Sequence, residues 1–168
     1  KVQRPSTCNA VETLIVHQGI ARHWLASFIE KLVAANVEVR GCQKTCQLSS
    51  SAKPASDEDF GKEFLDLTVA VKVVKHVDEA MEHIAKYGSR HTEAIVTSNY
   101  PKAMRFLREV DAGAVLVNAS TRLNDGYQFG LGAEIGISTS RIHARGPMGL
   151  EELTCFKFIV MGSGQIRE

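Results

Sequence analysis

Apolar residues gather into short continuous runs that alternate with segments in which they recur every three or four positions. Short runs are typical of buried strands, and the longer periodic segments are typical of amphipathic helices. The strongest run is Leu65–Val74, and Val77–Tyr87 follows it with helical periodicity. The expected strands are residues 12–17, 37–40, 65–74, 93–97 and 114–118, and the expected helices are residues 20–35, 77–87 and about 100–110. This alternation predicts an α/β fold with a mainly parallel, helix-covered sheet.

Residues at the helix ends agree with this pattern. Asp78 and Glu79 fall in the first turn of one helix, and Gly88 comes directly after its end. Asn99 can cap the next helix, whose first turn tolerates Pro101. The helix at residues 20–35 is expected to bury one face, formed by Trp24, Leu25, Phe28, Ile29 and Leu32.

Two stretches lack a regular pattern. The apolar signal disappears over residues 41–60, and we expect a surface loop there, centred on Leu48–Pro54. Residues 118–147 are rich in glycine, with Phe129–Gly136 at their centre. This stretch lacks the strand-turn-helix setting and the third glycine of a dinucleotide fingerprint. We interpret it as closely packed backbone near a site or as a plain loop, and not as a nucleotide-binding loop.

The C-terminal segment carries one more alternating pattern. Cys155–Met161 is expected to form a strand with no following element to cover it. Such a strand either pairs with a partner chain or forms an ordinary edge of the same sheet. Both alternatives stay open at this point.

Composition narrows the class of protein. The chain has 168 residues and 44% hydrophobic content, enough for one domain with a core and an appendage. A net charge of +1 gives no field that would attract nucleic acid or an acidic membrane surface. The sequence has neither a run of about 18 apolar residues nor a leader, so we expect a cytoplasmic protein without membrane contact that acts on small molecules or proteins.

Four cysteines are present, at positions 8, 42, 46 and 155. The spacing of Cys42 and Cys46 matches no familiar zinc site, and we expect no metal. Cys8 differs because it lies in a short polar turn directly ahead of an apolar strand. A thiol in such a place can reach a low pKa and act as a nucleophile, whereas an isolated cysteine is more often a small core residue.

Polar residues near the strands mark a candidate ligand site. In parallel sheets ligands bind outside the carboxyl ends of the strands, where we expect the stretches His91–Glu93 and Asn118–Thr121. Arg122, Arg141 and Arg145 could bind a carboxylate or a phosphate, since a guanidinium holds either group in a bidentate way. Each of them could also be an ordinary surface arginine.

Several longer motifs resemble one enzyme family. Val77–Ile95, Asn118–Thr121, Phe129–Ser140 and His143–Pro147 are similar to signatures of the γ-glutamyl phosphate reductases, also called glutamate-5-semialdehyde dehydrogenases. These enzymes belong to the aldehyde dehydrogenase superfamily. The resemblance runs through essentially all 168 residues and implies an oxidoreductase of proline biosynthesis.

The resemblance also implies roles for individual residues. Cys8, in Cys-Asn-Ala-Val-Glu-Thr-Leu, matches the family's nucleophile, which displaces phosphate from L-glutamyl 5-phosphate to give a thioester. Hydride from NADPH then yields the semialdehyde and frees the thiol. Glu63 is similar to the superfamily glutamate that hydrogen-bonds the nicotinamide ribose, although it could be a solvated charge. By analogy, His91, Asn118 and Ser120 shape the substrate pocket; the histidine could instead be structural, and the asparagine could bond its own turn.

The family places a nucleotide-binding domain and an oxyanion-hole asparagine ahead of the cysteine. We therefore expect residues 1–150 to be the catalytic, thiol-bearing domain and residues 151–168 an oligomerisation segment of a longer enzyme. The isolated chain is expected to be nearly inactive, because losing one oxyanion donor costs about 100- to 1000-fold in rate. Expected partners are the upstream half of the enzyme and further copies in a homo-oligomer. The alternative is a non-catalytic binding or assembly module of the same fold; a redox protein using Cys42 and Cys46 has little support.

Overall fold

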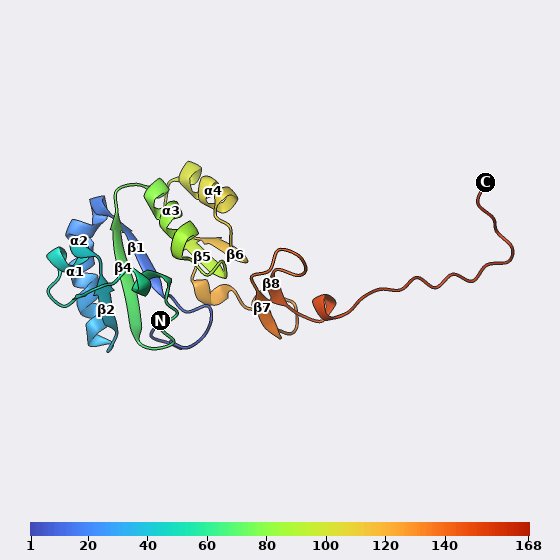
Figure 1. The fold of residues 1–168 in the computed structure, drawn as a ribbon, viewed down its shortest axis with the longest axis horizontal. Helices are drawn as coiled ribbons and strands as arrows, with labels where there is room; N and C mark the ends of the chain where they lie inside the picture. Colours follow the sequence, from blue (N-terminus) through green and yellow to red (C-terminus); the bar gives the residue numbers. More distant parts are fainter.

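The computed structural model describes residues 1–168 and shows an α/β body with a hairpin beside it and an extended C-terminal tail (Figure 1). The α/β fold with mainly parallel strands is confirmed. The parallel strands, however, divide into two sheets instead of one: a four-stranded sheet and a two-stranded sheet. The hairpin strands form a third, antiparallel sheet.

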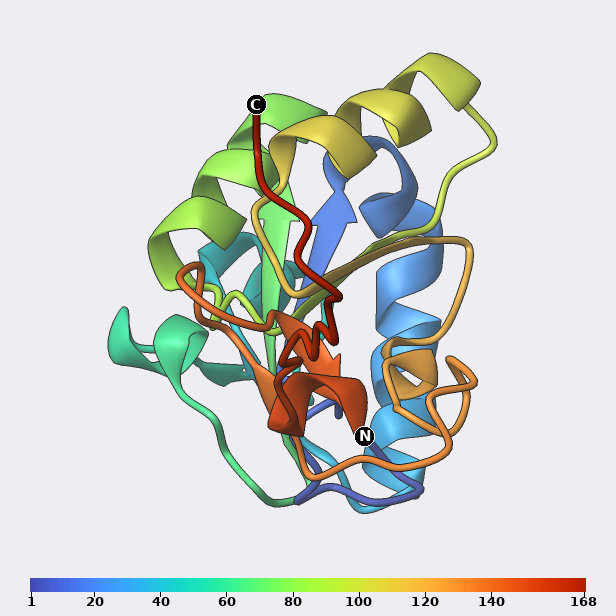
Figure 2. The same cartoon turned by 90° about the vertical axis from the view of Figure 1, so that its right-hand side faces the viewer.

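The four-stranded sheet has the strand order β1-β4-β2-β3 and is parallel throughout. Its central strand β4 is Thr68–Val74, where Ala70 and Val71 are completely buried. The other strands are β1 (Thr13–His17), β2 (Glu38–Gly41) and β3 (Lys53–Pro54). Parallel neighbours need crossover connections, which helices supply here. Figure 2 shows one such helix, α1, on one side of β1 and β4, and α3 on the other side.

Helix α1 is Gln18–Ala34 and supplies much of the core. Leu25 and Ile29 have no exposed surface and pack in a cluster with valines of β2 and β4. The predicted helix is therefore confirmed, and two of the five residues expected on its buried face are buried. Trp24 is 36% exposed, however, and stacks on Phe28 with ring centroids 4.3 Å apart. The expected apolar face is wider than the face that the sheet covers.

The loop expected over residues 41–60 is wrong in part. Helix α2 (Gln43–Leu48), strand β3 and the 3₁₀ helix η1 (Glu58–Gly61) lie in this stretch. Thr45 has no exposed surface, and its hydroxyl donates to the carbonyl of Val71 over 3.2 Å. A threonine and two cysteines form much of the inner face of α2, so a hydrophobic pattern does not reveal this helix.

The second parallel sheet pairs β5 (Thr92–Ile95) with β6 (Ala114–Val117). Helices α3 (Val77–Tyr87) and α4 (Tyr100–Glu109) lie before and after β5, as predicted. Asn99 caps α4 by accepting a hydrogen bond from the Lys102 amide over 2.9 Å, which confirms the predicted cap. The 3₁₀ helix η2 (Thr121–Leu123) follows β6.

The remaining residues extend from the body. Strands β7 (Gly136–Ser138) and β8 (Gly146–Met148) form the hairpin, and the 3₁₀ helix η3 (Glu151–Leu153) follows. The alternative in which Cys155–Met161 forms an edge of the same sheet is wrong, because these residues have no strand beside them and no regular structure. A strand that pairs with a partner chain stays a prediction. Phe156 and Phe158 are 95% and 96% exposed.

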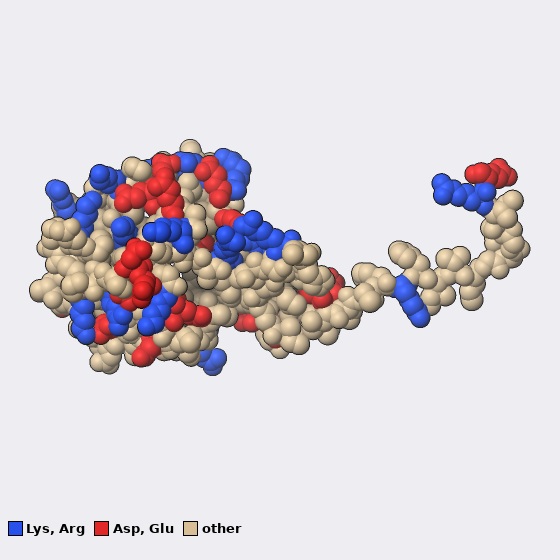
Figure 3. All heavy atoms as spheres, viewed as in Figure 1, with Lys and Arg blue, Asp and Glu red and all other residues tan.

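Charged side chains of both signs are interspersed over the body, whereas most of the extended tail is uncharged (Figure 3). None of the helices combines the length and the apolar character needed to cross a membrane.

Candidate functional site

Cys8 is exposed in a tight turn just before β1. The Ala10 amide donates to the carbonyl of Thr7 over 2.9 Å, and the Thr7 hydroxyl donates to the carbonyl of Arg4 over 3.0 Å. Glu63 comes before β4, the parallel neighbour of β1. Both residues therefore lie at the amino-end edge of the four-stranded sheet, and not at the carboxyl ends where the general rule for parallel sheets places ligands.

The turn that carries Cys8 is anchored by its neighbour Asn9, which is 5% exposed. The Asn9 side-chain amide donates to the carbonyl of Asn124 over 3.1 Å, and its oxygen accepts from the Arg122 guanidinium. The Thr121 hydroxyl donates to the Asn9 carbonyl over 2.7 Å. Buried polar groups that are bonded in this way fix their backbone, so the position of Cys8 depends on the segment around η2.

Asn124 connects this turn to β5. It has no exposed surface, and its amide donates to the Thr92 hydroxyl over 2.7 Å and to the carbonyl of His91 over 3.5 Å. The His91 Nδ1 lies 2.6 Å from the same hydroxyl. His91 Nε2 is buried and has no hydrogen-bond partner. One ring nitrogen is thus held by the protein, and the other is buried without a hydrogen-bond partner.

Charges around the site act on Cys8 and His91 together. Burial raises the pKa of the Cys8 thiol above its ordinary value, and the carboxylates of Glu134 and Glu63 raise it further. The backbone N–H groups of Cys8 and Asn9 oppose this shift. Burial lowers the pKa of His91, and the same two carboxylates oppose that change. The sequence allows a low thiol pKa at Cys8, whereas the pKa in this chain is raised, because the thiol is partly buried and two acidic groups act on it.

The predicted site residues divide into two groups. The carboxylates of Glu63 and Glu134 act on both Cys8 and His91, and Arg122 reaches the Cys8 turn through Asn9. The stretch at His91 reaches this site from the amino end of β5, not from the carboxyl end that we expected.

The other predicted residues are engaged elsewhere. The Asn118 amide bridges the backbone of Thr97, with bonds of 2.8 and 2.9 Å to its N–H and carbonyl. Ser120 caps η2 by accepting from the Arg122 amide. Arg141 and Arg145 both pair with Asp111, the latter over 2.7 Å. These bonds give the four side chains local structural roles.

Sequence reasoning missed Glu134 and Asn124. Glu134 accepts a hydrogen bond from the Gly126 amide over 2.7 Å, which holds it in the glycine-rich stretch. The glycine-rich character of that stretch, which we interpreted as backbone near a site, could have pointed to Glu134. No local pattern marks Asn124, because its partner Asn9 lies 115 residues away in the sequence.

The residues present fit one part of a nicotinamide cofactor. The Glu63 side chain is exposed and has no hydrogen bond or ion pair in the structure, so its carboxylate can accept from ribose hydroxyls. No three His, Cys, Asp or Glu side chains gather in a way that could hold a metal ion. The arrangement supplies an exposed thiol, two backbone N–H groups and a buried imidazole, which suits nucleophilic attack on an acyl group.

No model of a known protein family matches the chain, but curated proteins match it along its whole length. A γ-glutamyl phosphate reductase from Thermodesulfovibrio yellowstonii is 64% identical over 168 residues, and one from Desulfatibacillum aliphaticivorans is 65% identical over 167 residues. These alignments cover 100% and 99% of this chain. The chain spans 40% of the length of each of these relatives.

Solved structures agree with the sequence comparison. A γ-glutamyl phosphate reductase from Thermotoga maritima has a TM-score of 0.93 and 56% identity, over 100% of this chain and 41% of its own. An acetylating aldehyde dehydrogenase from Geobacillus thermoglucosidasius has a TM-score of 0.57 at 16% identity, over 99% of this chain and 47% of its own. The second likeness concerns the fold alone.

Proposed function

Because the chain belongs to the γ-glutamyl phosphate reductase family, we propose that it forms the thiol-bearing part of an enzyme of proline biosynthesis. That enzyme reduces L-glutamyl 5-phosphate to L-glutamate 5-semialdehyde and phosphate. The observation that carries the proposal is the exposed Cys8 on a turn anchored by buried Asn9, with His91 and two carboxylates around it.

We propose Cys8 as the nucleophile. Its thiolate attacks the acyl carbon, the bond to the phosphate oxygen breaks, and phosphate leaves with the electron pair. The backbone N–H groups of Cys8 and Asn9 lie near the sulfur, where the first can also stabilise negative charge on the acyl oxygen. A raised thiol pKa means that little thiolate is present at neutral pH in this chain. A cation near the thiol, supplied by substrate or by a further part of the enzyme, would offset the two carboxylates.

NADPH would supply the hydride that reduces the acyl group, and Glu63 would hold its nicotinamide ribose. The free Glu63 carboxylate before β4 supports this assignment. We propose His91 as a substrate-binding residue, because its Nε2 is buried without a hydrogen-bond partner and the carboxylates that act on Cys8 act on its ring as well. Arg122 acts as a positioning residue through Asn9.

We further propose that residues 1–150 are a catalytic domain and that the tail is an oligomerisation segment. The tail exposes consecutive apolar side chains that have nothing to pack against in this chain, including Phe156, Phe158 and Met161. Analytical ultracentrifugation is expected to show self-association that is lost on removing residues 155–168. A monomer at high concentration would contradict this part of the proposal.

Acyl transfer to the thiol can be tested without the cofactor. Acetyl phosphate, the smallest acyl phosphate, is expected to acetylate Cys8 as a thioester that hydroxylamine removes at neutral pH. Intact-mass and peptide measurements would detect it. Cys8→Ser should abolish the adduct, while Cys155→Ser, which changes another exposed cysteine, should retain it. Equal acetylation of both cysteines would contradict the assignment of the nucleophile.

The charges at the site provide a second test. Glu134→Gln removes a carboxylate that raises the pKa of Cys8, so iodoacetamide should label Cys8 about threefold faster at pH 7.5. Glu82→Gln removes an exposed carboxylate of α3 that does not act on the thiol, and it serves as the control. An unchanged labelling rate in the first variant would mean that Glu134 does not act on the thiol.

A further inference from the structure

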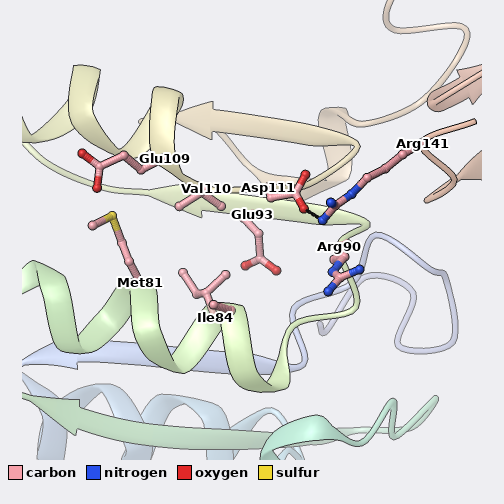
Figure 4. Close-up of a pocket in the computed structure, with 9 residues that line it drawn as sticks. Met81, Ile84, Arg90, Glu93, Glu109, Val110, Asp111 and Arg141 are labelled. Carbon is pink, nitrogen blue, oxygen red and sulfur yellow. Dashed lines mark hydrogen bonds and ion pairs between the residues drawn. The ribbon is translucent and has the colours of Figure 1, made fainter.

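A cleft of about 250 Å³ lies between α3, the end of α4 and the start of β5 (Figure 4). Met81, Ile84 and Val110 form its apolar wall. Charged side chains line the rest, and Figure 4 shows the Glu93 carboxylate among them. Neither Cys8 nor Glu63 contributes to the cleft.

Glu93 is the unusual residue of this cleft. It is half-buried on β5, and its carboxylate makes no hydrogen bond or ion pair in the structure. A Cβ added at Gly88 would lie 2.8 Å from Glu93 Oε1, so the carboxylate rests against the end of α3. Burial raises the pKa of Glu93 to about 7. The last carbonyls of a helix carry partial negative charge, so carboxylate and helix end both attract a cation.

Arg90 is the counterpart of Glu93 in the same cleft. It is exposed, it has φ = +63°, and its guanidinium has no carboxylate partner. The other charges of the cleft are already paired: Arg141 bonds Asp111, and Glu109 bonds Arg105 over 2.9 Å. No ion pair joins Arg90 to Glu93, so the cleft presents one unpaired cation and one unpaired anion beside an apolar wall.

We propose that this cleft binds a small aliphatic α-amino acid as a zwitterion. The ligand's ammonium group meets Glu93, its carboxylate meets Arg90, and its side chain packs against Met81, Ile84 and Val110. An α-amino acid is the common small metabolite class that carries both charges two bonds apart beside an apolar group. The contact with Glu93 should be the stronger of the two, because this carboxylate is half-buried and already partly removed from water, whereas Arg90 is exposed.

The cleft is separate from the site at Cys8. Successive side chains of a strand point to opposite faces. Thr92 faces the Asn124 network that supports the Cys8 turn, whereas Glu93, the next residue, faces α3 and the cleft. The proposed site therefore does not depend on the function assigned to Cys8.

Isothermal titration calorimetry of the chain with L-leucine at pH 8 tests the proposal. We expect saturable one-to-one binding that 4-methylpentanoate, which lacks the ammonium, and 3-methylbutylamine, which lacks the carboxylate, each weaken by about tenfold or more. No saturable binding of L-leucine up to about 10 mM would overturn the proposal. Equal binding of 4-methylpentanoate would overturn it as well, because an anion alone would then suffice.

Substitutions test which side chain binds which charged group of the ligand. Glu93→Gln and Arg90→Gln should each lower the affinity for L-leucine about tenfold. Glu93→Gln should then bind 4-methylpentanoate about as well as L-leucine, and Arg90→Gln should bind 3-methylbutylamine about as well as L-leucine. Glu109→Gln changes a lining carboxylate that is already paired, so it should leave the affinity unchanged. Cys8→Ser should also leave it unchanged. Loss of L-leucine binding in Cys8→Ser would overturn the separation of the two sites.

Discussion

The two parallel sheets of this chain differ sharply in how well they are covered. In β4, six of the seven residues are buried, with Lys72 alone partly exposed. In β5 and β6, every residue is half-exposed. The four-stranded sheet is closed on both faces by its own helices, whereas the two-stranded sheet leaves part of its surface uncovered. The first sheet supplies stability, and the second sheet borders both the network that supports Cys8 and the Glu93 cleft.

The largest loss of stability is expected for a substitution in the core that covers the four-stranded sheet, compared with one in the two-stranded sheet. Leu25→Ala removes a side chain that has no exposed surface and should lower the free energy of unfolding by about 3 to 4 kcal/mol. Leu116→Ala, in β6, should cost about 1 kcal/mol because its site is already half-exposed. Urea unfolding measures both values. Equal costs would mean that the two sheets are equally well packed.

A smaller loss of stability is expected on removing the Asn124 side chain, which connects the Cys8 turn to β5. Asn124→Ala removes a buried amide and the two hydrogen bonds that it donates to Thr92 and His91. The free energy of unfolding should fall by about 2 to 3 kcal/mol. Amide hydrogen exchange at Asn9 and Ala10 should become faster, because the Asn124 carbonyl that accepts from Asn9 is then no longer held against β5 by the Asn124 side chain. Protection that stays unchanged in the turn would show that the two regions are independent.

An effect of the opposite sign, a gain in stability, is expected at Glu93. In the unfolded chain this carboxyl loses its proton near its ordinary pKa of 4.5, while in the folded chain it keeps the proton until about pH 7. The folded state binds more protons between these values, so the stability of the wild type falls as pH rises through this window. Glu93→Gln should therefore be more stable than the wild type by about 3 kcal/mol at pH 8.

The pH dependence separates this cause from a change in packing. The advantage of Glu93→Gln should shrink as the pH falls below 7 and vanish near pH 4, where both forms are neutral. Thermal unfolding across this range would measure it. An advantage that stays constant with pH would point to packing, and Glu109→Gln should show no such gain because its carboxylate is exposed and paired.

Much of the fold could be predicted from local patterns. Helices α3 and α4 and strand β4 have clear periodicity and recognisable ends, such as Asn99 and Gly88. Helix α2 could not be predicted, because Thr45 is buried through a hydrogen bond to Val71 and not through apolar character. The division into two sheets depends on contacts between distant strands, which no local pattern records.

Only those residues of the candidate site that lie in family motifs could be predicted from the sequence. Cys8, Glu63 and His91 follow from family motifs, and the Glu63 carboxylate acts on both of the other two side chains. The raised pKa of Cys8 depends on Glu134, which lies 126 residues further along the chain. The pairing of Asn9 with Asn124 also joins distant segments. Such contacts exist only after folding, so spacing within a short motif cannot reveal them.

The alternation along β5 limits how this protein can change over evolution. Thr92 and Glu93 serve opposite faces, and the turn at Gly88–Arg90 sets which residue faces which side. Inserting or deleting one residue in that turn would shift β5 by one position and exchange the two faces. A carboxylate would then meet the Asn124 network, and a threonine would line the cleft. Point substitutions can accumulate here, but a change in the length of this turn would disrupt both sites at once.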